Sequence, residues 1–78
     1  MNLQGLYLSG NQISVIPAEI FTLVSLRELD LSDNNISMLP PEIAGLVNLR
    51  VLNLSDNQVP STSDIITDLK ARGVFFVI

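Results

Sequence analysis

Four acidic side chains in the middle of the chain have the clearest potential for chemistry. Glu28, Asp30 and Asp33 lie close together along the chain, and Asp56 follows Asp33 after 23 residues. Carboxylate oxygens are ligands that calcium prefers, but the loop pattern of an EF-hand is absent. The chain also has no His and no Cys, so it lacks the commonest general base and the usual zinc ligands. Since there is also no nucleophile paired with a base and no glycine-rich phosphate loop, we expect no catalytic activity, no cofactor and no bound metal.

The charge balance and the hydropathy exclude two kinds of partner. Four Lys and Arg residues against eight Asp and Glu residues give a net charge of -4, the wrong sign for binding nucleic acid. The 78 residues are 47% hydrophobic, yet no apolar run approaches the roughly 18 residues of a membrane span. The N-terminus has no basic segment followed by an apolar one. We therefore expect neither nucleic acid nor membrane as a partner, and the lack of a signal peptide and of cysteines favours a cytoplasmic protein.

An internal repeat of 23 residues sets the positions of all these side chains. Within each repeat two leucines are two residues apart, so in a β-strand they point to the same face. One strand cannot bury its leucines, but strands stacked at roughly 4.8 Å place each leucine beneath its copy. The repeat length is therefore the length of chain that goes around once. The aligned columns are Leu3, Leu26 and Leu49; Leu6, Leu29 and Leu52; Leu8, Leu31 and Leu54; and Asn11, Asn34 and Asn57.

The repeated blocks resemble a known family. The segments LQGLYLSGNQI, LRELDLSDNNI and LRVLNLSDNQV are similar to the signature of leucine-rich repeats. The resemblance implies an α/β fold, a right-handed solenoid with a short parallel sheet on the concave face and 3-10 or helical turns on the convex face. We expect a single domain over residues 1–78, with repeats at about 1–23, 24–46 and 47–69 and a last helix and strand within 63–78.

The recurring asparagines and prolines have structural interpretations. A stacked column of amides at Asn11, Asn34 and Asn57 can satisfy backbone groups that the turning chain would otherwise bury without partners. Pro17 and Pro40 mark the start of each convex turn, because proline tolerates a first helical turn but not a strand interior.

The third repeat departs from the pattern after Val59. The segment PSTSDIITDLKARG predicts a helix of about eight to ten residues, with Ser63 as N-cap, Asp64 in the first turn and Gly73 as the stop. The closing segment VFFVI predicts a fourth strand. A constant 23-residue shift from the third repeat places Phe75 and Val77 in the core, in register with the leucine columns, and turns the apolar residues Val74, Phe76 and Ile78 toward solvent.

If the concave sheet binds a protein or peptide, its outward residues Tyr7, Glu28, Asp30 and Asn53 are the predicted contacts. Tyrosine is a rigid amphipathic anchor of the kind that dominates binding interfaces. The acidic middle favours a partner with Lys or Arg opposite it. The alternative is that these residues only keep a small sheet soluble.

The exposed stripe predicted at Val74, Phe76 and Ile78 also indicates a homodimer. The last strand has an unpaired edge without charges or proline, and pairing with a second copy would bury the stripe with micromolar affinity. The competing contact is the open N-terminal end at Leu3, Leu6 and Leu8, and the parent protein can also continue beyond Ile78.

Three functions remain open from the sequence. The first is a non-catalytic protein-binding module, as the resemblance implies. The second is a structural unit that associates with itself. The third is a recognition or regulatory segment of a larger multidomain enzyme, since such repeats occur beside GTPase, kinase and ubiquitin-ligase domains. Fold similarity by itself does not choose among them.

Overall fold

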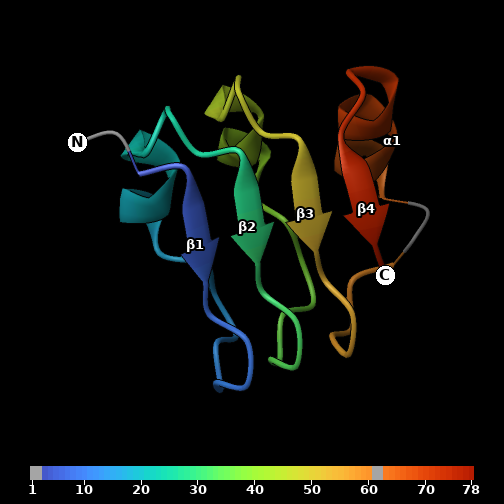
Figure 1. Cartoon of the computed structure of the whole chain (residues 1–78). Helices are drawn as coiled ribbons and strands as arrows, with labels where there is room; N and C mark the ends of the chain where they lie inside the picture. Colours follow the sequence, from blue (N-terminus) through green and yellow to red (C-terminus); the bar gives the residue numbers. More distant parts are fainter. Residues whose placement is uncertain (1–2, 61–62) are drawn as a thin grey trace.

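The 23-residue repeat builds a single parallel β-sheet. The computed structural model describes residues 3–60 and 63–78. Its strands are β1 (Gly5–Tyr7), β2 (Glu28–Asp30), β3 (Val51–Asn53) and β4 (Phe75–Val77), paired in that order (Figure 1). Leu6 pairs with Leu29 and Leu29 with Leu52, both at the repeat spacing. The expected solenoid, with a parallel sheet on one side and helical turns on the other, is confirmed.

The inward leucines of the second and third repeats form the core. Leu29, Leu31, Leu52 and Leu54 are all buried, as the two-residue spacing predicts. In the first repeat Leu6 and Leu8 are only partly buried, and Leu3 is 36% exposed. These leucines are less covered because no turn of the described chain lies beyond β1.

Short helical turns return the chain on the convex side, behind the sheet in Figure 1. Two are 3-10 helices, η1 (Ala18–Thr22) and η2 (Pro41–Gly45), and Pro17 and Pro40 stand at their N-caps in extended conformation. Each turn buries one isoleucine, Ile20 or Ile43. The prolines therefore begin the convex turns, as predicted.

The third return segment is an α-helix, α1 (Asp64–Ala71), of eight residues. Ser63 is at its N-cap position, although its side chain makes no capping hydrogen bond. Ile66 and Leu69 are buried against the core. Gly73 has a φ of 93°, a left-handed conformation that suits glycine and ends the helix. The helix and both of its end residues lie where the sequence places them.

Asparagine side chains close the turn after each strand. The Asn34 amide donates to the carbonyls of Leu31 (2.9 Å), Ser32 (3.0 Å) and, in the preceding repeat, Leu8 (3.1 Å). Its oxygen accepts from the backbone N–H of Ile13 at 3.0 Å. Asn57 makes the equivalent bonds to the second repeat. Its oxygen, for example, accepts from the backbone N–H of Ile36 at 2.8 Å. The structural interpretation of the asparagine column is confirmed for these two repeats.

The first asparagine has a smaller role. Asn11 is exposed, and its amide donates only to carbonyls of its own turn, Leu8 at 2.8 Å and Ser9 at 3.4 Å. Asn11 therefore stabilises one turn, whereas Asn34 joins two.

The predicted register of the last strand is wrong by one residue. Phe76 pairs with Leu52, an offset of 24 rather than 23, and it packs against the core. Phe75 is 65% exposed and Val77 36% exposed, while Val74 is buried. A one-residue slip turns every side chain of a strand to the other face. The return through α1 is one residue longer than the returns through η1 and η2, so the constant shift fails here.

Ile78 is exposed to solvent, as predicted. It follows Val77 at the end of the chain given and is 52% exposed. The apolar residues that face solvent at this end are therefore Phe75, Val77 and Ile78, and Val74 and Phe76 no longer belong to that group.

Candidate protein-binding face

The outward side chains of the four strands define one surface, which we call the concave face. The strand register aligns them in two columns. The first column is Gly5, Glu28, Val51 and Phe75, and the second is Tyr7, Asp30, Asn53 and Val77. The four predicted contact residues thus lie on one face, on three adjacent strands. Their role in binding stays a prediction.

Tyr7 is held across the sheet by a neighbouring acid. Its side chain is 64% exposed, and its hydroxyl donates to Glu28 Oε2 at 2.9 Å. The ring lies over Gly5, where an added Cβ would come within 2.8 Å of the Tyr7 hydroxyl. Gly5 therefore permits the close approach of the ring, a role that the sequence did not reveal because the Tyr7 hydroxyl bonds to Glu28, which is far away along the chain.

The Glu28 carboxylate raises the pKa of Tyr7 above its ordinary value of 10.0, first through this hydrogen bond and then through its charge. The neutral phenol is thereby favoured in the folded chain. The resulting stabilisation is complete below pH 10 and is lost as the pH rises through the higher folded pKa.

We predict that Glu28→Ala lowers the pKa of Tyr7 toward its ordinary value, because it removes both the acceptor and the charge. Tyr7 is the one tyrosine of the chain, so the phenolate absorbance during a pH titration reports on it alone. Glu42→Ala, on the exposed convex turn, is the matched control and should leave the titration unchanged. Equal titration curves for Glu28→Ala and the unmodified chain would show that the hydrogen bond is absent in solution.

Asp30 and Asn53 make the same local bonds in adjacent repeats. The Oδ1 of Asp30 accepts from the backbone N–H of Ser32 at 3.0 Å and from its hydroxyl at 2.7 Å. Asn53 accepts from Ser55 in the same way, at 3.0 and 2.8 Å. Both residues thus support the turn after their strand, and they differ in charge.

The C-terminal end of the concave face is apolar, as the sequence predicts, but the exposed residues on strand β4 are Phe75 and Val77 rather than Val74 and Phe76. Phe75 and Val77 lie beside Val51 and Asn53 of β3 and expose much of their surface. The side chains of the concave face therefore differ from one edge of the sheet to the other. Tyrosine stands at the β1 edge, two acids follow on β2, and apolar side chains stand at the β4 edge.

Neither a metal site nor a membrane span is found in the described residues. Among residues 3–60 and 63–78, no three acidic side chains lie together as a group that can hold a metal ion. In the same ranges, no helix has the length and apolar character needed to cross a bilayer.

Comparison with known proteins agrees with this geometry. The family model described as leucine rich repeat matches residues 1–59, so the chain belongs to the leucine-rich repeat family. Among solved structures, the chain is similar to a leucine-rich repeat protein of Leptospira interrogans, with 27% sequence identity and a TM-score of 0.61. The match covers 97% of this chain and 25% of that one, so the chain spans about a quarter of its length. A comparison with curated proteins gave no match. The family is generally non-enzymatic and suggests a protein-interaction module.

Proposed function

We propose that the chain is a non-catalytic module that binds a protein or peptide on its concave face. The observation that carries the proposal is that the concave face has an exposed tyrosine at one end and exposed apolar side chains at the other. Tyr7 is fixed at one end by Glu28, and Phe75 and Val77 are exposed at the other. Rigid aromatic anchors and exposed apolar surface are typical of protein-binding sites.

The charge of the face selects the partner. Glu28 and Asp30 lie on β2, one of the two inner strands, between the tyrosine and the apolar end. A partner with Lys or Arg opposite these acids gains electrostatic complementarity, which acts mainly on the association rate and weakens as salt is added.

The test is a comparison of binding constants for a partner isolated by cross-linking from the source of the protein. Tyr7→Ala is expected to weaken binding by about tenfold or more, since truncation of an interface tyrosine is often costly. Asp30→Asn removes only the charge, because Asn53 shows that asparagine makes the same bonds to the following serine. It should slow association and flatten its dependence on salt.

Control substitutions on the convex side test whether an effect on binding is specific to the concave face. Glu19→Gln and Glu42→Gln change charge on exposed convex turns and should leave the affinity unchanged. A partner whose affinity is the same for Tyr7→Ala, Asp30→Asn and the unmodified chain would exclude the concave face as the binding surface.

A second proposal is self-association through β4. This strand is the last of the sheet, and Phe75, Val77 and Ile78 expose apolar surface beside its unpaired edge. Antiparallel pairing with β4 of a second copy would cover both features in a two-fold dimer. The stripe on which the dimer rests consists of these three residues rather than Val74 and Phe76. The partly covered leucines of the first repeat offer the competing contact.

A third proposal is that the chain acts as a recognition or regulatory segment of a larger protein. It is favoured by the match to about a quarter of the Leptospira protein. The concave face would then be one part of a longer binding surface, and the experiments on Tyr7 and Asp30 apply to it unchanged.

A further inference from the structure

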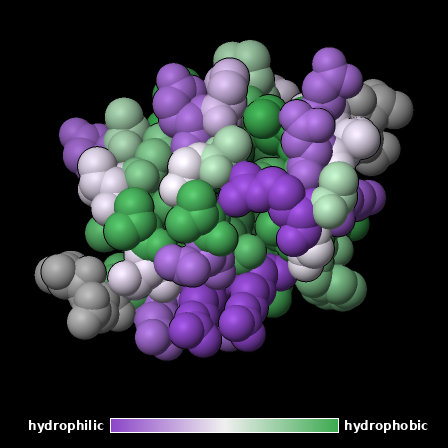
Figure 2. All heavy atoms as spheres, turned by 90° about the horizontal axis from the view of Figure 1, so that it is seen from above, coloured by the Kyte–Doolittle hydropathy of each residue, from purple (hydrophilic) through white to green (hydrophobic). Residues whose placement is uncertain are grey.

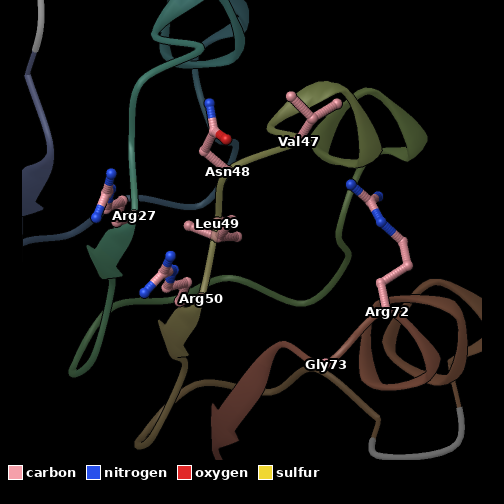
Figure 3. A pocket seen from close by; sticks show the side chains of 7 residues that line it. All are labelled: Arg27, Val47, Asn48, Leu49, Arg50, Arg72 and Gly73. Atoms are coloured by element: carbon pink, nitrogen blue, oxygen red, sulfur yellow. The ribbon is translucent and has the colours of Figure 1, made fainter.

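Three of the four basic residues of this acidic chain line one pocket. The pocket has a volume of about 420 Å³ and lies where the chain enters the strands, at the N-terminal edge of the sheet (Figure 3). Its lining residues are Arg27, Val47, Asn48, Leu49, Arg50, Arg72 and Gly73. Basic charge is therefore concentrated at this edge, although the net charge of the chain is -4.

Arg27 and Arg50 are brought together by the sheet. They occupy equivalent positions before β2 and β3, and the backbone N–H of Arg50 donates to the Arg27 carbonyl at 2.8 Å. Their side chains lie close to each other and point in the same direction (Figure 3). Like charges on adjacent strands repel each other and destabilise the sheet. This arrangement therefore has a cost that a bound anion would offset.

The far side of the pocket is formed by Arg72. Its Nη1 donates to the carbonyl of Ala44 at 3.0 Å, and the side chain reaches from the end of α1 toward η2 (Figure 3). This bond uses one of the five N–H donors of the guanidinium, so the others stay available. Arg72 is thereby held in place while it adds positive charge to the pocket.

Within residues 3–60 and 63–78, no carboxylate forms an ion pair with Arg27 or Arg50. The nearest carboxylate in sequence, that of Glu28, accepts the hydroxyl of Tyr7 on the concave face. Figure 2 looks onto this end of the molecule and shows hydrophilic side chains side by side at the lower margin, and others nearer the centre with hydrophobic atoms between them. The pocket wall also includes the exposed side chain of Val47 and the buried Leu49.

We infer that this pocket binds an oxyanion-bearing side chain of a peptide, either a carboxylate or a phosphoryl group. The planar guanidinium donates two parallel hydrogen bonds to either group, which favours arginine at such sites. The inference deepens the proposed function and rests on it. The partner segment carries an anionic group at the N-terminal edge of the strands and a cationic group opposite Glu28 and Asp30, and these two charges fix its direction across the sheet.

The inference is tested by NMR titration with three short capped peptides of one sequence, in which a central pair of residues is Asp, phosphoserine or Asn. The Nε–H signals of Arg27 and Arg50 are expected to shift with at least one anionic peptide at low salt and to stay in place with the Asn peptide. The anionic peptide that binds more tightly identifies whether the pocket prefers a carboxylate or a phosphoryl group. Shifts that are no larger than those of the Lys70 signals, or that the Asn peptide reproduces, would overturn the inference.

Matched variants assign the binding to the pocket. Arg27→Gln with Arg50→Gln should weaken the anionic peptide about tenfold or more, because charge-assisted hydrogen bonds are lost. Lys70→Gln removes a positive charge outside the pocket lining, near the Phe76 ring, and should change the affinity less than about twofold, since exposed charges contribute little. A double variant that binds as tightly as Lys70→Gln would refute the site. The result for Tyr7→Ala with the isolated partner is independent of these titrations, so failure of the pocket is distinguishable from failure of the concave face.

Discussion

Replacing Asn34 with alanine is expected to lower the free energy of unfolding by about 3 kcal/mol, among the larger effects of a single substitution. The side chain is 5% exposed and joins two repeats through bonds to Leu8 and Ile13. Alanine leaves the Ile13 N–H and several carbonyls without a partner where water has little access. Urea unfolding followed by circular dichroism measures the difference.

Asn11→Ala is the matched control for this experiment. It removes the same amide from the equivalent position of the first repeat, where the side chain is exposed and bonds only within its own turn. We expect a loss of less than about 1 kcal/mol, since water replaces these bonds. Equal losses for the two variants would mean that the asparagine column contributes through each turn separately and does not join the repeats.

The second large effect concerns the last strand. Phe76→Ala is expected to reduce the free energy of unfolding by about 2 kcal/mol, because the ring packs against the core, though at the end of the sheet. Phe75→Ala should change it by less than about 0.5 kcal/mol, since that ring is 65% exposed. Denaturant unfolding of the two variants thus tests the register. A larger loss for Phe75→Ala than for Phe76→Ala would show that β4 follows the 23-residue shift instead.

The same pair of positions tests self-association. Sedimentation of the unmodified chain is expected to show a dimer with micromolar affinity, and Phe75→Lys should make it monomeric while the fold is retained. A monomer at high concentration would rule out self-association. A dimer that Phe75→Lys leaves intact would move the contact to the leucines at the N-terminal end of the solenoid.

Local signals in the sequence determined much of the fold. The repeat spacing predicted the stacking of the first three strands and the hydrogen-bonding role of Asn34, because equal lengths of chain with equal side chains stack in register, and the resemblance to leucine-rich repeats implied that the sheet is parallel. The helix was predicted closely as well, since its signals, from Ser63 through the buried Ile66 and Leu69 to Gly73, lie within a short stretch of chain.

Tertiary structure decided the features that depend on neighbouring turns. The register of β4 depends on how many residues α1 uses to return to the sheet, compared with the 3-10 turns, and composition does not give that number. Tyr7 and Glu28 meet only because β1 and β2 pair, and their hydrogen bond accompanies the position of the Tyr7 ring over Gly5. The arginine pocket likewise combines two strand entries with the end of a helix. In each case the distance between the side chains is set by the packing of separate repeats, which a single repeat does not encode.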